Sequence, residues 1–224
     1  MLLTITEVLD AAALAEVNTL LDRAPFEDGR ASAGAEAARV KRNEEVPSRE
    51  ALTRALNERV LRPLYAHPVF QAAALPARLS GAFFARYRPG MEYGWHVDDP
   101  VMGPEGGRYR TDVSITIFLA APEDYDGGEL VIQTEHGEQR FKGAAGSALI
   151  YPSGSLHRVA PVTRGERRVA VAWAQSLVRG AEQRRLLYEL HTAVEALRTT
   201  LPEAQITRQL RHVHINLVRL WAEP

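Results

Sequence analysis

The segment "MEYGWHVDDP", residues 91–100, places a histidine and an aspartate two positions apart beside bulky aromatic residues. In an extended strand, alternate residues project from the same face, so His96 and Asp98 can converge on one point. Together they offer an imidazole nitrogen and a carboxylate oxygen, two common ligand types for a metal ion. Asp99 should project from the opposite face. The alternative is an ordinary strand end that leads into an acidic turn, because a His-x-Asp pair often occurs by chance.

A second stretch, residues 151–173, adds a histidine and an arginine to this chemistry. His157 begins one predicted strand and Arg167 begins the next. If residues 164–166 form a hairpin loop, Thr163 pairs with Arg167 and the odd-numbered residues share an interior, mostly apolar face. A buried guanidinium without an anion is costly, so Arg167 requires either an internal acidic residue or a bound carboxylate or phosphate.

Two histidines and one carboxylate on a β framework form a facial triad, which leaves the opposite side of a metal open. This arrangement is typical of non-haem Fe(II) sites that activate O2. The chain has no cysteine, which excludes disulfides, thiolate zinc sites and thiol catalysis. The remaining histidines fall in turns, in loops or on predicted C-terminal helices, and we expect them to be structural or exposed: His67, His136, His191, His212 and His214.

The elements that must position these residues are short strands between residues 78 and 177. Runs such as "DVSITIFLAA", "GELVIQTE" and "RRVAVAWAQSL" are rich in β-branched and aromatic residues, and clusters of Gly, Pro and Asp separate them. Short strands at such spacing are typical of an antiparallel sandwich or barrel. The sequence therefore predicts a mainly β core over residues 78–177.

Helical periodicity flanks this core on both sides. Residues 1–77 contain two amphipathic helices, the first capped by Asp10, and form a predicted N-terminal helical and mixed segment. Between these helices, residues 27–47 are small and polar, which predicts a mobile loop with a short strand that could form a lid over the open side of the metal. Residues 178–224 carry two apolar stripes joined near a proline, which predict a C-terminal helical hairpin.

The charge balance is even, with 27 basic and 28 acidic residues and a net charge of −1. This gives no reason to expect nucleic-acid or membrane binding. The N-terminus lacks a basic region before its apolar stretch, so we expect no signal peptide and a cytoplasmic location. We also expect a homodimer, because the predicted C-terminal hairpin carries apolar stripes.

Three stretches, "RYRPGMEYGWHVDDP", "DVSITIFLAAPEDYDGGEL" and "HRVAPVTRGERRVAVAW", resemble the Fe(II)/2-oxoglutarate-dependent dioxygenases of the prolyl-hydroxylase superfamily. The chain is most similar to the bacterial PKHD-type hydroxylases within this group. The superfamily likeness covers about residues 80–177, whereas the PKHD-type likeness extends over nearly the whole chain. The resemblance implies a double-stranded β-helix, or jelly roll, for the predicted core.

The resemblance also implies roles for individual residues. His96, Asp98 and His157 would ligate Fe(II), and Arg167 would bind the C5 carboxylate of 2-oxoglutarate. The implied reaction consumes O2, converts 2-oxoglutarate to succinate and CO2, and hydroxylates a C–H bond, with ascorbate as the customary reductant. Many relatives carry a tyrosine on the strand after the His-x-Asp loop to help bind 2-oxoglutarate, but this chain does not. Tyr87, which we favour, Tyr151 and Ser114 are the candidates for that contact.

The metal set alone also permits a different function, a cupin-like metal-binding isomerase or a ligand sensor without oxidative turnover. Arg167 argues against this alternative, because a fixed arginine near the metal implies an anionic cosubstrate. The substrate stays open among peptidyl proline, a free amino acid and a siderophore-like small molecule. PKHD-type proteins are associated with bacterial iron uptake, which makes that process an expectation for this chain.

Overall fold

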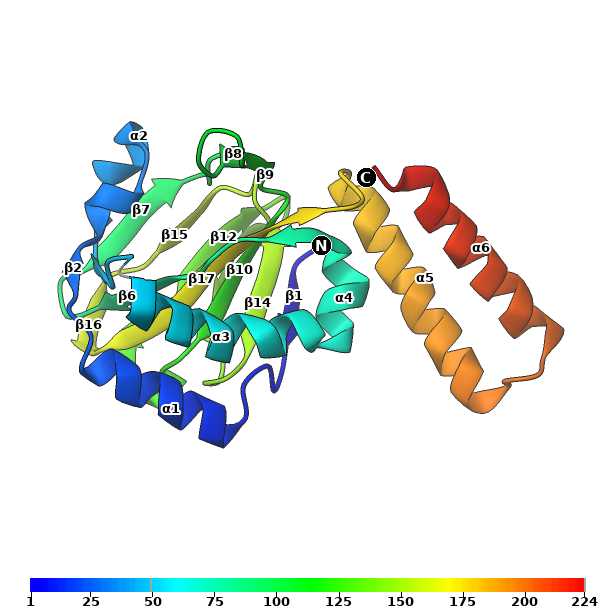
Figure 1. The fold of residues 1–224 in the computed structure, drawn as a ribbon, viewed down its shortest axis with the longest axis horizontal. Helices are drawn as coiled ribbons and strands as arrows, with labels where there is room; N and C mark the ends of the chain where they lie inside the picture. The colour runs from blue at the N-terminus through cyan, green and yellow to red at the C-terminus, as the bar shows by residue number, and fades with distance from the viewer. Residues whose placement is uncertain (49, 224) are drawn as a thin grey trace.

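A computed structural model describes residues 1–48 and 50–223 of the chain. Its body is a sandwich of antiparallel sheets, and helices cover one outer face of the larger sheet (Figure 1). In order across this larger sheet the strands are β1 (Leu3–Ile5), β14 (Ala148–Pro152), β10 (Val113–Phe118), β17 (Arg167–Ser176), β6 (Phe83–Tyr87), β4 (Glu44–Glu45) and β2 (Glu27–Asp28), and β5 (Pro76–Leu79) also pairs with β17.

The smaller sheet of the sandwich contains both predicted histidine ligands. Its strands, in order, are β13 (Gly137–Phe141), β12 (Leu130–Thr134), β15 (His157–Val159), β7 (Glu92–His96) and β3 (Lys41–Arg42). Two further pairs are β11 (Tyr125–Gly127) with β16 (Val162–Gly165), and β8 (Val101–Met102) with β9 (Tyr109–Arg110). The chain repeatedly crosses between the sheets, as in a double-stranded β-helix, which confirms the predicted jelly-roll core.

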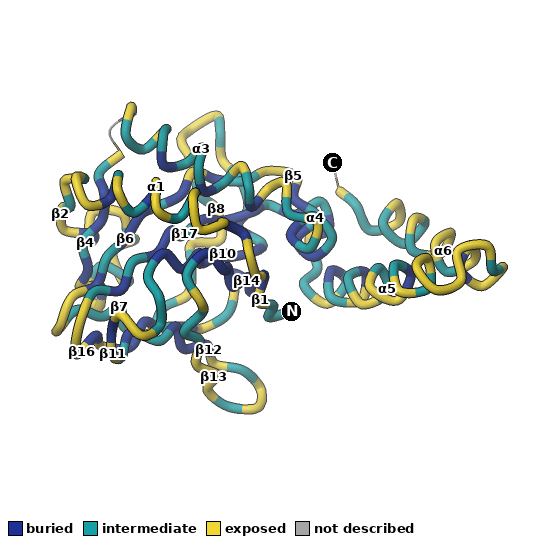
Figure 2. Tube along the Cα trace, turned by 90° about the horizontal axis from the view of Figure 1, so that it is seen from below, coloured by how far each residue is buried: buried dark blue, intermediate teal, exposed yellow. Residues whose placement is uncertain are grey.

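Strand alternation divides the interior into two hydrophobic clusters. On β10, Ile115 and Ile117 face the helices, whereas Phe118 packs between the sheets. On β17, Ala170 and Ala172 face the helices, and Val169 packs between the sheets. All residues of β10 are buried because both faces of this central strand are covered (Figure 2). Polar residues on its inner face are therefore available to a buried site.

The helices occupy three places in the molecule. Three helices lie against the larger sheet or at its edge: α1 (Ala11–Asp22), α3 (Glu50–Ala66) and α4 (Pro68–Ala74). Three short helices lie in loops: η1 (Gly29–Ser32), α2 (Ala35–Ala38) and η2 (Pro122–Asp124). The C-terminal hairpin consists of α5 (Ala181–Thr200) and α6 (Gln205–Trp221). Asp10 caps α1 as predicted, since its Oδ1 accepts a 2.8 Å hydrogen bond from the amide of Ala13. The predicted hairpin is confirmed and projects from the body (Figure 1). None of the helices in the described ranges is long and apolar enough to span a bilayer.

Two local predictions were wrong. Thr163 does not pair with Arg167: β16 pairs with β11, and β17 pairs with β10 and β6. Alternation within β17 is a local property and was predicted correctly, but the partner of a strand depends on the crossing between sheets. Residues 27–47 are not a simple loop with one strand, because they contain β2, η1, α2, β3 and β4.

Candidate active site

The structure brings His96, Asp98 and His157 together, with their potential ligand atoms all within 4.8 Å of one another. Oδ1 of Asp98 lies 4.0 Å from Nε2 of His96 and 3.8 Å from Nε2 of His157. Two atoms that each bind one ion at about 2.1 Å are separated by at most roughly 4.2 Å. Both distances meet this limit, so the donor set fits a divalent metal ion bound by two imidazoles and one carboxylate.

Both imidazoles are oriented by hydrogen bonds from their other nitrogen. Nδ1 of His96 lies 2.8 Å from the carbonyl oxygen of Gly94, and Nδ1 of His157 lies 2.9 Å from that of Ser155. A carbonyl oxygen only accepts, so each Nδ1 carries a proton and Nε2 is the nitrogen left on each ring to bind a metal. Burial lowers the pKa of His96, and the neighbouring His157 lowers it further, which keeps its imidazole neutral.

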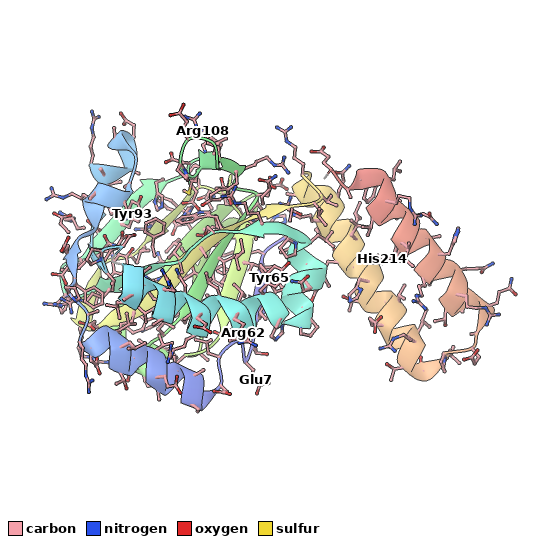
Figure 3. All side chains as sticks on the ribbon, viewed as in Figure 1. Glu7, Arg62, Tyr65, Tyr93, Arg108 and His214 are labelled. Carbon is pink, nitrogen blue, oxygen red and sulfur yellow. The ribbon has the colours of Figure 1, made fainter. Side chains whose placement is uncertain are left out.

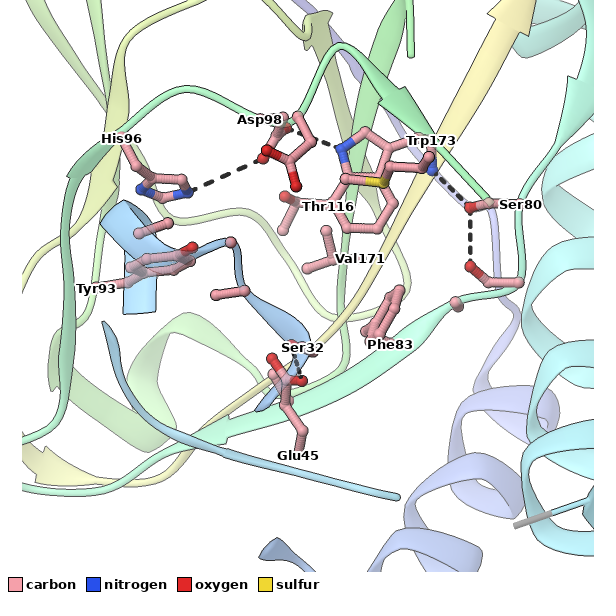
Figure 4. A pocket seen from close by; sticks show the side chains of 18 of the residues that line it. Ser32, Glu45, Ser80, Phe83, Tyr93, His96, Asp98, Thr116, Val171 and Trp173 are labelled. Atoms are coloured by element: carbon pink, nitrogen blue, oxygen red, sulfur yellow. Dashed lines mark hydrogen bonds and ion pairs between the residues drawn. The ribbon is translucent and has the colours of Figure 1, made fainter. Parts of the chain in front are cut away.

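Asp98 lies just beyond the end of β7, so strand alternation alone does not hold it beside His96. Its Oδ2 accepts a 2.5 Å hydrogen bond from the Ser114 hydroxyl. The same oxygen accepts a 2.9 Å hydrogen bond from Nε1 of Trp173 (Figure 4). These two donors leave Oδ1 directed to the histidines. Ser114, a candidate for 2-oxoglutarate binding, instead donates its hydroxyl proton to Asp98. Asp99 is exposed and is not part of the triad, although it also lines the cavity.

Arg167 is the largest fully buried side chain in the described part of the protein, with 1% of its surface exposed. Its Nε and Nη1 atoms have no hydrogen-bond partner among the described residues. An unpaired buried guanidinium is costly, so these atoms are suited to a carboxylate supplied by a ligand. Among the described residues no acidic side chain forms an ion pair with Arg167, which favours the bound-ligand alternative.

Tyr87 lies opposite Arg167 on the neighbouring strand, and the guanidinium carbon is 4.9 Å from the centre of its ring. Burial raises the pKa of Tyr87 to about 12, although the positive charge of Arg167 opposes this shift. The hydroxyl therefore stays protonated and is able to donate a hydrogen bond. Tyr151 is also buried, and burial raises its pKa well above the usual range. Its ring contacts His157 edge-on, with the ring centres 5.1 Å apart.

All five predicted site residues line one cavity of about 740 Å³. Figure 4 shows His96 and Asp98 at this cavity. This volume is within the usual range for small-molecule sites. Part of its wall is apolar and aromatic, including Phe83 and Trp173, whose rings meet edge-on at 5.6 Å. Another part is polar and comes from the segment predicted as a mobile loop, with Ser32, Lys41 and Glu45 among its lining residues.

Sequence reasoning missed the residues that support the site. Trp173 was predicted to share the interior face with Arg167, but nothing in the spacing linked its indole nitrogen to Asp98. Lys41 and Glu45 were missed because polar residues in an aperiodic stretch usually indicate solvent exposure, whereas here both are buried. The remaining histidines take no part in the metal cluster that the described residues form.

Comparisons with known proteins agree with this geometry. The profile of the 2OG-Fe(II) oxygenase superfamily matches residues 82–175, and that of the PKHD-type hydroxylase C-terminal domain matches residues 182–223. The chain is 65% identical to a PKHD-type hydroxylase of Thioalkalivibrio sulfidiphilus, and the alignment covers 100% of both chains.

Solved structures show the same fold at low sequence identity. A Pseudomonas putida prolyl-4-hydroxylase has a TM-score of 0.53 and 20% identity, over 78% of this chain and 92% of the other. A Trichoplax adhaerens prolyl hydroxylase, solved in complex with a hypoxia inducible factor oxygen degradation domain peptide fragment, has a TM-score of 0.56 and 17% identity, over 83% of this chain and 86% of the other. Because the chain is 65% identical to a PKHD-type hydroxylase over its full length and both domain profiles match, it belongs to the PKHD-type hydroxylases of the 2OG-Fe(II) oxygenase superfamily.

Proposed function

We propose that this PKHD-type hydroxylase binds Fe(II) through His96, Asp98 and His157 and binds 2-oxoglutarate through Arg167 and Tyr87, in order to hydroxylate a C–H bond of a small molecule or peptide. The observation that carries the proposal is the buried guanidinium of Arg167, whose Nε and Nη1 atoms have no hydrogen-bond partner among the described residues, in the same cavity as the three converging ligand atoms. A metal site without an anionic cosubstrate would have no use for such a cation.

Each residue has a defined task in this scheme. His96 and His157 coordinate the metal through Nε2, because their Nδ1 protons are held by backbone carbonyls. Asp98 contributes one carboxylate oxygen and neutralises part of the metal charge. Ferrous iron and 2-oxoglutarate, once bound, supply the oxidation: O2 and the oxo acid are consumed, succinate and CO2 are released, and one oxygen atom enters the substrate C–H bond.

Arg167 fixes the far end of the oxo acid, because a planar guanidinium binds a carboxylate through two parallel hydrogen bonds. Tyr87 lies beside it as a protonated hydroxyl that donates to the same ligand. The edge-on pair of Phe83 and Trp173 forms an apolar wall that excludes water from part of the cavity. The open side of the triad and this wall together define the space for the substrate.

The direct test is conversion of 2-oxoglutarate to succinate by the purified protein with Fe(II) under air. We expect succinate to depend on Fe(II) and to be lost in Asp98→Ala and His157→Ala, with His136→Ala as an exposed histidine control. Metal binding without succinate under all conditions would instead favour a cupin-like isomerase or a ligand sensor.

The substrate requires a screen scored by the mass gain of one oxygen atom. Peptidyl proline, free amino acids and siderophore-like chelators are the classes to include, the last because it would connect the enzyme to bacterial iron uptake. Ascorbate, included as the reductant in half of the reactions, is expected to sustain turnover by keeping the iron ferrous. A cytoplasmic location belongs to the same proposal.

The C-terminal hairpin supports a homodimer as part of the proposal. Ile206, Val213 and Leu220 recur along one side of α6 and are 48%, 45% and 73% exposed. An apolar stripe of this kind is typical of a helix that packs against another helix. Light scattering should give twice the chain mass for the wild-type protein and a lower mass for Val213→Glu.

A further inference from the structure

The segment of residues 29–45, here called the wall segment, spans the gap between the two sheets beside the cavity. Lys41 and Arg42 pair with β7 in the smaller sheet, whereas Glu44 and Glu45 pair with β6 in the larger sheet. Its residues that line the cavity are Ser32, Ala33, Gly34, Ala37, Lys41 and Glu45. A ligand that fills this side of the cavity therefore contacts the wall segment.

A buried cluster of three polar side chains connects the two ends of the wall segment. Nζ of Lys41 lies 2.6 Å from Oε1 of Glu45 and donates to the Ser32 hydroxyl at 2.7 Å. The hydroxyl donates in turn to Oε2 of Glu45 at 2.6 Å (Figure 4). Only 5% of Lys41 and 9% of Glu45 are exposed. Because a buried ion pair is often no more stabilising than apolar residues of equal size, its presence points to a role in fixing positions.

One route from this cluster leads to the metal site through aromatic rings. Nζ of Lys41 is 5.3 Å from the centre of the Tyr93 ring, which projects from β7 (Figure 3). That ring stacks on the imidazole of His96, with the centres 3.6 Å apart and the planes 13° apart. Two successive contacts therefore connect Lys41 to the His96 ring.

A second route runs through the backbone and is independent of the first. The amide of Gly94 donates a 2.8 Å hydrogen bond to the carbonyl oxygen of Val40, which belongs to the wall segment. The carbonyl oxygen of the same Gly94 accepts the proton on Nδ1 of His96. A Cβ atom on Gly94 would lie only 2.7 Å from Cβ of Val40, so glycine permits this close approach.

We propose that the wall segment positions the metal ligand His96, with Lys41 and Gly94 as the positioning residues. The wall of the substrate cavity and the imidazole then behave as one unit. A substrate that contacts the wall segment stabilises the orientation of the metal ligand His96. By reciprocity, metal binding orders the wall segment. The inference rests on the proposed metal site, but not on the identity of the substrate.

The first experiment measures the affinity for Co(II), used alone as an air-stable probe, by calorimetry. Lys41→Met keeps the length of the side chain and removes its charge, and Lys41→Met/Glu45→Gln also removes the unpaired carboxylate. We expect both variants to bind Co(II) about 10-fold more weakly than the wild type. This is the lower end of the loss in metal affinity that follows removal of a group that orients a metal ligand. Arg42→Met is the matched control, because Arg42 is the next residue, is exposed and pairs with Glu92; it should bind normally.

The second experiment tests the backbone route and its reciprocity. Gly94→Ala should weaken Co(II) binding by displacing Val40, and Val40→Gly in the same chain should restore it by removing the opposing Cβ. Co(II) should also slow proteolysis within residues 29–45 of the wild-type protein. This protection should be reduced in Lys41→Met and retained in Arg42→Met.

The outcomes separate this inference from the proposed function. If the wild type does not bind Co(II), the metal site is wrong and the inference fails with it. If the wild type binds Co(II) but Lys41→Met and Gly94→Ala bind it equally well, the metal site stands and the positioning role is overturned. Equal proteolysis of the wall segment with and without Co(II) would also overturn the coupling.

Discussion

The indole nitrogen of Trp173 donates a 2.9 Å hydrogen bond to Oδ2 of Asp98, the carboxylate oxygen that faces away from the two histidines. The Ser114 hydroxyl donates to the same oxygen, and it also lies 2.9 Å from the Ser153 hydroxyl. Both donors come from strands of the larger sheet, whereas Asp98 follows β7 of the smaller sheet. The two hydrogen bonds therefore connect this metal ligand to the opposite sheet of the sandwich. Loss of either donor should loosen the metal site without removing a ligand.

Trp173→Phe is the cleanest test of this hydrogen bond. The phenyl ring retains most of the apolar wall beside Phe83 but cannot donate to Asp98. We expect affinity for Fe(II), measured anaerobically, to fall about 10-fold, as is usual for loss of a partner that orients a metal ligand. Trp95→Phe is the control, since Trp95 is 38% exposed and stacks with Arg158. Equal affinities in Trp173→Phe and the wild type would show that Ser114 suffices.

Much of this site was predictable from the sequence because its chemistry depends on local patterns. His96 and Asp98 are two positions apart, His157 begins a strand, and alternation along β17 places Arg167 on the interior face. An antiparallel sandwich or barrel followed from short β-rich runs between turn residues, and the family resemblance implied the jelly-roll topology. These signals need no knowledge of which strand pairs with which.

The supporting contacts were not predictable, because they join positions that no sequence spacing relates. Ser114 and Trp173 meet Asp98 only after β10 and β17 pair within the larger sheet. Lys41 and Glu45 are buried together although their segment has the composition of an exposed loop. Pairing of distant strands and mutual burial of opposite charges are tertiary effects, and they determine these supporting contacts.

Arg167→Ala should raise the apparent KM for 2-oxoglutarate by roughly 30-fold, the equivalent of about 2 kcal/mol for a lost hydrogen-bonded contact with a carboxylate. The matched control is Arg168→Ala, because Arg168 pairs with Asp22 and Glu166 on the other side of the sheet. Steady-state succinate formation at several 2-oxoglutarate concentrations measures both. A KM that does not change in Arg167→Ala would refute its role in cosubstrate binding.

Tyr87→Phe and Tyr151→Phe distinguish two buried hydroxyls in the same cavity. Tyr87 lies opposite Arg167, so its loss should weaken 2-oxoglutarate binding, with most of the effect in KM. Tyr151 contacts His157 rather than the guanidinium carbon, so Tyr151→Phe should leave KM for 2-oxoglutarate close to normal. The reverse ranking would reassign the second hydrogen bond to Tyr151.

The unfolding free energy of the metal-free protein should depend on pH through His96. Its folded-state pKa is lowered by burial and by His157, whereas in the unfolded chain it returns to about 6.5. Below about pH 6.5 the unfolded state takes up the proton and the folded state does not, so stability decreases as the pH falls toward the folded-state pKa. Urea unfolding at pH 7.5 and 5.5 measures this loss. His96→Gln should reduce the difference between the two pH values, and His136→Gln should not; an unchanged difference in His96→Gln would contradict the assignment.

The most direct test of the whole account is an anaerobic absorption titration of the wild-type protein with Fe(II) and 2-oxoglutarate. Chelation of a 2-oxo acid to ferrous iron produces a weak visible charge-transfer band. We expect this band to require both additions, to be absent in Asp98→Ala, and to need far more 2-oxoglutarate in Arg167→Ala. No band in the wild type at saturating Fe(II) and 2-oxoglutarate would contradict the central claim that His96, Asp98 and His157 hold iron while Arg167 holds the oxo acid.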